Sequence, residues 1–374
     1  DNASTGDTVF VFAGSYYEKV TVNTPNIQLI GEDQNSTFIN YSILGFSDSI
    51  IRLSSNHIQF SHFTVSLTNG MCEGIYLKGA TDCNVSFTTV NSTVGMYVDN
   101  SNYNTIYHNK ISSAIEGIAI AEDVNSSSFN IIKGNSFTNS GLSDYEYNDG
   151  IVLFEKASNN TVIGNYFNDC QCDAIDTVAA YNNIIENNLI IGNTSRSQTG
   201  IYLSWRFEPS FIGNIVRQNI IRNCSGGGIA TNTDGDTITD NLLENDGYGL
   251  SIDFGPRNTI IKNNTIRDCQ VGQDLWYADR GTILEGNLYD HNTEAIEVWY
   301  CQNVTFTRNT YRNNTFGIVC HVSHRNIFLQ NNFEGNTITV WNIISRNHWR
   351  QNYWDQPRLL PKPLFGYLPF IQFD

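Results

Sequence analysis

An internal repeat is the feature that most constrains how this chain can fold. From residue 104 onward the pattern Asn-x-aliphatic-x-x-Asn-x-aliphatic or aromatic recurs, first over residues 104–111 and then over residues 130–137. Between residues 219 and 331 its second Asn returns every 22 or 23 residues. A second pattern, Gly-Ile-x-aliphatic, alternates with the first, as in Gly74-Ile-Tyr-Leu and Gly200-Ile-Tyr-Leu. The chain is therefore built from repeated units.

Each unit contains short segments with aliphatic residues at alternate positions, and no stretch shows a helical period. A repeat of about 22 residues with short strands and no helix is typical of one coil of a right-handed parallel β-helix. We therefore predict an all-β, single-domain solenoid of about a dozen coils. The abundant Asn residues are predicted to be structural, because Asn tolerates the left-handed backbone of a corner and its amide can bond the Asn of the next coil.

The repeat also predicts the organisation of the chain. Residues 1–50 are expected to form an N-terminal cap and the first coils, residues 51–354 the repeat coils, and residues 355–374 a C-terminal tail or cap of one continuous domain. The tail is apolar and rich in proline. It either caps the last coil or docks onto a neighbouring molecule, because an open coil end exposes strand edges.

Residues 7–18, residues 27–33 and the segment Asn352-Tyr353-Trp354 resemble parallel β-helix repeat proteins of the NosD type. These proteins are also described as carbohydrate-binding and sugar-hydrolase domains, and many are secreted or lie at the cell surface. The resemblance covers nearly the whole chain and implies the β-helix fold, whereas a repeat motif alone implies no activity. Named NosD members assist copper-site assembly. This chain has only 2 Met and scattered His residues, with His57/His62 and His321/His324 as close pairs, so no metal or cofactor is predicted.

Charge and composition narrow the partners and the compartment. The net charge is −16, with no basic patch for nucleic acid, and no apolar run is long enough to span a membrane. An extracytoplasmic location, secreted or at the cell surface, is expected, because eight cysteines would suit disulfides there. Buried free thiols are the alternative for these cysteines. Glycosylation sequons, which suit the same location, occur at Asn2, Asn35, Asn40, Asn84, Asn91, Asn125, Asn159, Asn193, Asn223, Asn263, Asn303 and Asn313.

The second and fourth residues after each Gly of the Gly-Ile segments should point outward. Asp274 and Glu297 are then expected on adjacent strands, about 4.8 Å apart at the backbone. Beside these acids Trp276, Trp299, His321 and Trp341 are expected to form an aromatic stripe. Paired carboxylates and aromatic faces suit a carbohydrate ligand. The candidate catalytic residues are Asp274, Glu297 and Asp253. The candidate substrate-binding residues are Trp276, Trp299, His321, Trp341, Tyr202, Arg206 and Arg280.

Two functions remain open at the level of the sequence. The first is a cell-surface protein with a structural role in an envelope, sheath or filament, or with a glycan-binding role. The alternative is a polysaccharide hydrolase or lyase that uses the acids named above. The expected partners are a polysaccharide, other envelope proteins or further copies of the chain.

Overall fold

The structure is a computed structural model of the 374-residue chain. It describes residues 3–43, 48–113, 115–121, 126–138, 149–170, 172–194, 198–205, 213–355, 363–367 and 372–373. The chain divides into two compact units, Asp1–Ile190 and Ile191–Asp374, and each is described in turn. All regular elements of the described residues are β-strands, and no helix among them is long and apolar enough to cross a membrane.

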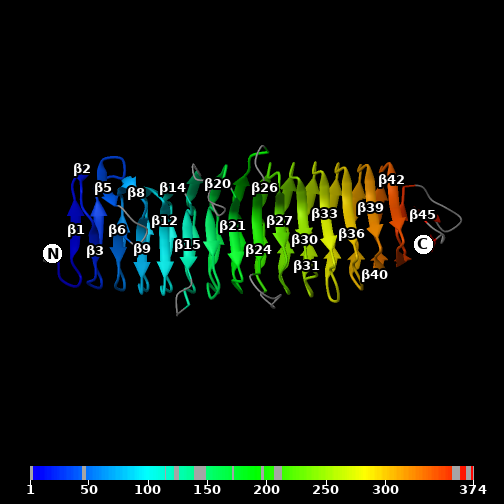
Figure 1. Cartoon of the computed structure of the whole chain (residues 1–374), viewed down its shortest axis with the longest axis horizontal. Coiled ribbons are helices and arrows are strands. Elements are labelled where there is room, and N and C mark those ends of the chain that lie inside the picture. Colours follow the sequence, from blue (N-terminus) through cyan, green and yellow to red (C-terminus); the bar gives the residue numbers. More distant parts are fainter. Residues whose placement is uncertain are drawn as a thin grey trace. The chain divides into compact units, whose positions relative to one another are not determined.

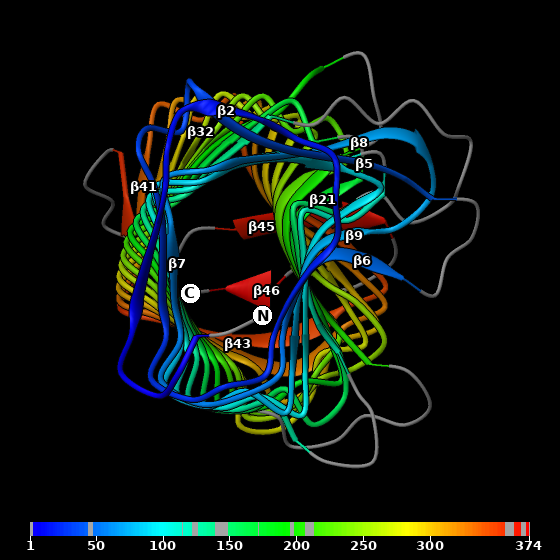
Figure 2. The same ribbon diagram turned by 90° about the vertical axis from the view of Figure 1, so that its left-hand side faces the viewer.

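Unit 1 is a parallel β-solenoid in which each turn adds one strand to each of three sheets, A, B and C. Figure 2 shows β7, β8 and β9 on three different sides of one turn. Its sheet A contains β1 (Thr8–Val11), β4 (Gln28–Gly31), β7 (Gln59–Ser61), β10 (Asn84–Ser86), β13 (Thr105–Tyr107), β16 (Ile131–Lys133), β19 (Thr161–Ile163) and β22 (Ile184–Glu186). Its sheet B contains β2 (Gly14–Tyr16), β5 (Thr37–Ile43), β8 (Thr64–Gly70), β11 (Thr89–Ser92), β14 (Lys110–Ser113), β17 (Ser136–Thr138) and β20 (Tyr166–Asn168). Its sheet C contains β3 (Val20–Val22), β6 (Ser49–Leu53), β9 (Glu73–Lys78), β12 (Val94–Asp99), β15 (Ile118–Ala121), β18 (Ile151–Leu153) and β21 (Asp173–Val178).

Unit 2 repeats the same three-sheet plan, and β23 (Leu189–Ile191) lies at the boundary between the units. Its sheet A contains β25 (Ile215–Arg217), β28 (Thr237–Thr239), β31 (Ile260–Lys262), β34 (Ile283–Glu285), β37 (Thr305–Thr307), β40 (His324–Leu329) and β43 (Arg346–Arg350). Its sheet B contains β26 (Ile220–Arg222), β29 (Leu242–Glu244), β32 (Thr265–Arg267), β35 (Leu288–Asp290), β38 (Thr310–Arg312), β41 (Asn332–Glu334) and β44 (Tyr353–Trp354). Its sheet C contains β24 (Thr199–Ser204), β27 (Gly227–Thr231), β30 (Tyr248–Ile252), β33 (Val271–Trp276), β36 (Glu294–Trp299), β39 (Phe316–His321), β42 (Ile338–Ile343), β45 (Pro363–Tyr367) and β46 (Gln372–Phe373). Figure 1 shows β27, β30, β33 and β36 side by side in chain order.

The parallel strands pair in register, so equivalent residues of successive turns lie above one another. In sheet B of unit 2, Tyr289 stacks on Tyr311 with ring centroids 5.2 Å apart, and Tyr311 stacks on Phe333 at 4.8 Å. These three side chains are fully buried. Stacks of this kind fill the interior of each turn, and the prediction of an all-β parallel solenoid is confirmed.

The repeated Asn residues form buried hydrogen-bond ladders between turns. Asn264 Nδ2 donates to Asn287 Oδ1 at 3.0 Å, and Asn287 Nδ2 donates to Asn309 Oδ1 at 3.0 Å. The same Asn287 Oδ1 also accepts the backbone N–H of Asn264. The predicted ladder is therefore present, and it satisfies backbone groups that the turn would otherwise leave unpaired inside the protein.

The left-handed backbone of the corners lies directly before ladder Asn residues. Gly286 and Arg308, which precede the ladder residues Asn287 and Asn309, have φ values of 66° and 55°. Asn takes the same place at Asn187 and Asn263, with φ values of 55° and 54°, so the prediction that Asn adopts this backbone at corners is confirmed there. The ladder Asn residues themselves do not have positive φ, and for them the prediction was wrong, because the preceding residue makes the bend.

All eight cysteines are free thiols, and only Cys172 is not buried. Cys83 and Cys301 instead direct their sulfur atoms at backbone carbonyls of their own turns or the preceding turn. Of the two alternatives that the cysteine count left open, the buried thiols are the ones present.

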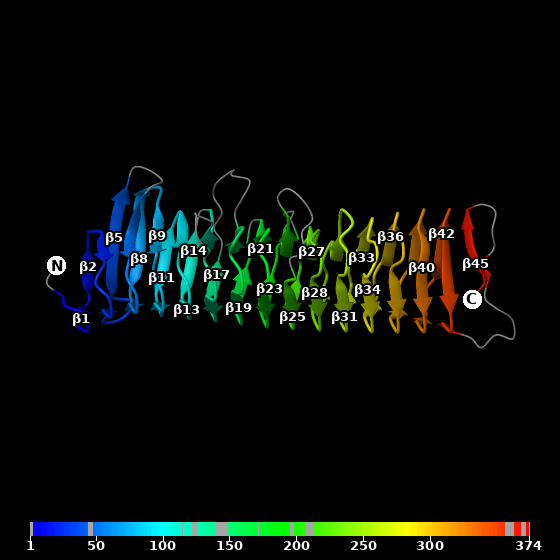
Figure 3. The same cartoon turned by 90° about the horizontal axis from the view of Figure 1, so that it is seen from below.

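The C-terminal tail extends sheet C of unit 2. Strand β45 pairs in parallel with β42, with Phe365 opposite Trp341, and β46 pairs in antiparallel with β45. Figure 3 shows β45 beyond β42 at the end of the unit. This backbone pairing adds two strands at the edge of β42.

Candidate functional site

Two of the predicted acids lie on neighbouring strands of sheet C in unit 2. Asp274 of β33 lies opposite Glu297 of β36, with Ser251 before them and Val319 after them in the same row. Asp274 is buried and Glu297 is half-buried. The register predicted for this pair is therefore the register observed.

An aromatic row runs beside the acids on the same face. Trp276 lies opposite Trp299, and Trp299 lies opposite His321. The Trp276 and Trp299 ring centroids are 5.4 Å apart, and the Trp299 and His321 centroids are 3.6 Å apart with nearly parallel planes. Trp276 is 39% exposed, so part of an indole face is open to a ligand.

Trp341 does not belong to this aromatic row, and its predicted place was wrong. It lies opposite Val319, which puts it in the row of Asp274 and Glu297, and Ile343 lies opposite His321. The error arose because β42 has no Gly-Ile pair from which the outward positions of the strand could be assigned. Val340, and not Ile338, occupies the position of Ile318.

A groove in unit 2, called here the acid groove, has a volume of about 460 Å³. It is lined by Thr199, Tyr202, Gly226, Gly227, Ala230, Tyr248, Ser251, Asp253, Asp274 and Trp276. Three predicted site residues besides Trp276 are thus in its wall, namely Tyr202, Asp253 and Asp274. None of these lining residues is Lys or Arg.

The two predicted arginines are not part of this wall. Arg280 is exposed and lies in the turn between β33 and β34. Arg206 lies outside the described residues. Asp176, a further acid of sheet C, is buried on β21 of unit 1.

Asp274 is the most perturbed of the predicted acids. Burial, followed by the charges of Glu297 and Asp253, raises the pKa of Asp274 to about 7. Its Oδ1 is buried and has no hydrogen-bond partner. Since an unpaired buried acceptor is costly, a ligand that donates a hydrogen bond there would be favoured.

Glu294 is an acid of the site that the sequence did not predict. It begins β36, in a row with Tyr248 and Val271. Burial, followed by the charge of Glu297 and a hydrogen bond shared with it, raises the pKa of Glu294 to about 7. Glu294 was missed because only the second and fourth residues after the Gly position were expected to face outward. Its position in the same row as Tyr248 could have indicated that this residue also faces outward.

Two hydrogen-bonded pairs involve residues of the wall. Ser251 Oγ donates to Asp253 Oδ2 at 3.0 Å, and Asn232 Nδ2 donates to Tyr202 Oη at 3.0 Å. Burial raises the pKa of Asp253, although the bond from Ser251 opposes this change.

His321 closes the far end of the aromatic row as a weak base. Its Nε2 lies 3.9 Å from Oε1 of Glu297. Burial lowers the pKa of His321, and the charge of Glu297 opposes this effect. The imidazole is therefore neutral at pH 7 and supplies no countercharge to the acids.

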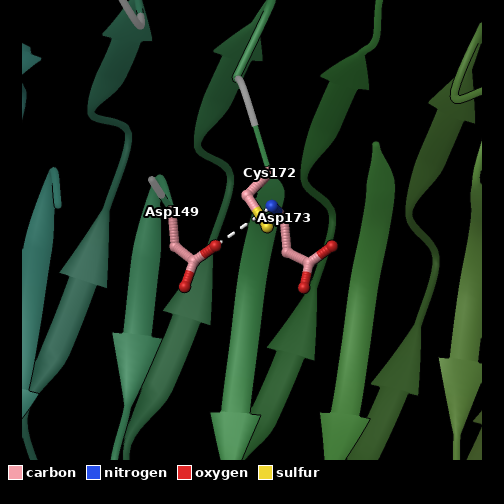
Figure 4. A group of neighbouring side chains, drawn as sticks. All are labelled: Asp149, Cys172 and Asp173. Carbon is pink, nitrogen blue, oxygen red and sulfur yellow. Dashed lines mark hydrogen bonds between the residues drawn. The ribbon is translucent and has the colours of Figure 1, made fainter. Parts of the chain in front are cut away.

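A separate cluster lies in unit 1, where ligand atoms of Asp149, Cys172 and Asp173 are all within 4.8 Å of one another (Figure 4). The backbone N–H of Asp173 donates to Asp149 Oδ1 at 3.0 Å. Burial raises the pKa of Asp149 to about 7. This is the one group of three such side chains in the part of the chain that the structure describes.

Family comparisons bear on both units. Residues 73–235 match the family model "Right handed beta helix region", and residues 209–360 match "Periplasmic copper-binding protein (NosD)". The chain is a right-handed β-helix protein. No curated protein sequence matches it.

Solved β-helix structures resemble this β-helix protein at low sequence identity. The A-module of the mannuronan C-5 epimerase AlgE4 of Azotobacter vinelandii is 14% identical, with 90% of this chain and 88% of that chain covered and a TM-score of 0.50. The alginate lyase AlyF-OU02 is 13% identical, with 83% and 80% covered and a TM-score of 0.52. The receptor-binding tailspike protein of bacteriophage Det7 is 11% identical, with 82% and 70% covered and a TM-score of 0.60. These similarities concern the fold alone.

Copper, which the second family description names, does not fit the donors of this β-helix. Copper sites favour imidazole, thiolate and thioether ligands. Among the described residues, no cluster of three metal-ligating side chains contains a His, and the Asp149 cluster offers one thiol beside two carboxylates. Of the two Met residues, Met96 is fully buried in the core.

Proposed function

We propose that this chain is an extracytoplasmic glycan-binding β-helix protein and that the acid groove holds the sugar chain. The main support for this proposal is the position of Trp276. Its partly exposed indole lines the groove beside the carboxylate oxygen of Asp274 that has no hydrogen-bond partner. An aromatic face covers the apolar face of a sugar ring, and buried acceptors bind its hydroxyl groups.

The location rests on two further observations. The NosD family model describes a periplasmic protein. None of the ten sequon asparagines among the described residues is buried, so each has the exposure that a glycan needs.

Affinity electrophoresis through gels that contain soluble neutral, acidic and amino polysaccharides tests the binding. Wild type should be retarded by at least one of them, and Trp276→Ala should weaken that retardation about tenfold, as expected for loss of a central Trp contact. Tyr103→Ala is the matched control. Tyr103 is 55% exposed and stacks on Phe129 at 5.0 Å, but it lies in unit 1, away from the acid groove.

Retardation that is unchanged in Trp276→Ala would move binding away from the acid groove. Failure of every polysaccharide to retard wild type would remove glycan binding and leave the structural role in an envelope, sheath or filament.

A polysaccharide hydrolase or lyase is the second candidate, and the acid pair favours it. A carboxylic acid with a pKa near 7 is suited to give a proton to a leaving group, and Asp274 meets this condition beside the carboxylate of Glu297. Asp253, in the wall of the same groove, is the third acid available to such an enzyme. New reducing ends or unsaturated products made by wild type, and not by Asp274→Asn/Glu297→Gln, would establish the enzyme. Their absence across the panel would leave a binding protein.

A further inference from the structure

Asp253 and Asp274 line the acid groove beside Tyr248, and Glu294 and Glu297 lie on β36, the strand next to Asp274. Burial raises the pKa of Tyr248, and the charges of Asp274, Glu297, Asp253 and Glu294 raise it further. The four acids come from three successive strands and turns of sheet C, so they are spread along the direction in which a chain-like ligand would lie.

Among the residues that the structure describes, the groove wall contains no basic partner for these acids. No Lys or Arg is among the lining residues, and the neighbouring His321 is neutral at pH 7. Two of the buried oxygens, Asp274 Oδ1 and Glu294 Oε2, have no hydrogen-bond partner. Partly desolvated carboxylates without a countercharge favour a ligand that brings both positive charge and N–H donors.

The spacing of the acids disfavours a single metal ion as that ligand. The only three metal-ligating side chains with donor atoms within 4.8 Å of one another, among the described residues, are in unit 1. The acids of the groove are therefore arranged for a distributed cation and not for a point charge.

The aromatic row also favours a positively charged ligand. The indole face of Trp276 is partly exposed and is stacked on Trp299. A Trp face attracts an ammonium group as well as the apolar face of a sugar, because its π-electrons are negative above the ring. A uronic acid would bring a negative charge to both the acids and the indole face.

We propose that the acid groove selects glycans whose sugars carry protonated amines, such as a polymer of glucosamine. This inference deepens the proposed glycan-binding function and rests on it. The sugar rings stack on Trp276, and the ammonium groups donate to Asp274 and Glu294.

Calorimetry at pH 7, where acids with a pKa of about 7 are partly ionised, tests the selection with three matched hexasaccharides. The probes are the glucosamine hexamer, the N-acetylglucosamine hexamer with the same backbone and no charge, and a hexamer of a uronic acid. The glucosamine hexamer should bind at least about tenfold more tightly than the acetylated one, and the uronic acid hexamer should bind least. Asp274→Asn and Glu294→Gln should each remove most of this preference.

Asp240→Asn is the charge-matched control, because Asp240 is exposed elsewhere in unit 2 and its φ of 57° is one that Asn tolerates. It should leave the preference unchanged. An equal loss in Asp240→Asn, or equal competition by hexalysine, would show attraction to the net charge alone and overturn the inference. Equal affinity for the two glucosamine hexamers would overturn the selection and leave glycan binding intact. If no hexasaccharide binds, the proposed function itself fails.

Discussion

Glu297 lies directly opposite Asp274 on the neighbouring strand of sheet C, and Glu294 shares a hydrogen bond with Glu297 from the start of the same strand. Glu297 therefore makes ionisation of both Asp274 and Glu294 less favourable. At neutral pH these two acids hold protons that ordinary surface acids would have lost. A proton held near neutral pH is what the proposed enzymatic alternative needs.

Ile296→Asp tests the register of sheet C. Ile296 is fully buried and points into the turn between Gln273 and Ile318. An unpaired charge at this position costs several kcal/mol, so the variant should be insoluble or melt at a much lower temperature. Thr293→Asp, at an exposed turn position, is the control and should melt like wild type. A normal melting curve for Ile296→Asp would refute the inward orientation.

The glycine of the Gly-Ile repeat is explained by contacts between turns. A Cβ on Gly228 would lie 2.6 Å from the carbonyl oxygen of Gly249, whereas on Gly227 the nearest atom would be 3.4 Å away. We therefore expect Gly228→Ala to lower the free energy of unfolding by about 1–3 kcal/mol and Gly227→Ala to change it little. Urea denaturation of the two variants measures the difference. Equal stability would show that the turns can separate to admit a methyl group.

Asn287→Ala tests the Asn ladder. The change removes the acceptor used by Asn264 and leaves the carbonyl of Ile261 and the amide of Asn309 with one bond fewer. Buried groups left unpaired cost about 1–3 kcal/mol each, so a clear fall in melting temperature is expected. Asn91→Ala, at an exposed strand position, is the comparison and should have little effect. A similar small change in both would mean that water replaces the ladder.

Stability should fall as the pH rises from 5 to 8. Burial raises the pKa of Asp236 to about 7, and the pKa of Asp274 rises to about 7 in the same way. Between the unfolded pKa near 3.8 and the folded value, the native protein binds more protons than the unfolded chain, so raising the pH favours unfolding. Urea denaturation at pH 5 and pH 8 should show this loss.

Asp236→Asn isolates one contribution to that pH dependence. The carboxylate of Asp236 is fully buried in a ladder position, where it accepts the backbone N–H of Asn214 and the hydroxyl of Thr231. The amide carries no charge, so the variant should gain about 1–4 kcal/mol relative to wild type at pH 8 and much less at pH 5. A gain of equal size at both pH values would assign the effect to hydrogen bonding and not to ionisation.

The sequence was sufficient for the solenoid and for the central pair of acids. Asp274 and Glu297 each come directly after a two-residue segment that aligns with the Gly-Ile pair of the repeat. Because parallel strands pair in register, residues at the same position of the repeat lie opposite each other in successive turns. The same reasoning failed at Trp341, because β42 lacks the glycine that marks the count. The same reasoning did not predict Glu294, because the first residue of β36 also points outward.

By itself the sequence determined the length of the turn, the inward ladder of Asn residues and the stacking of like residues, because these follow from local periodicity repeated many times. Only the tertiary structure decided which outward side chains are desolvated, that the cysteines remain free thiols, that Tyr248 lines one groove with Asp274, and that Glu294 lies on the next strand. Burial and pKa depend on what neighbouring turns place around a residue. A one-dimensional repeat therefore records the position of a carboxylate but not its environment.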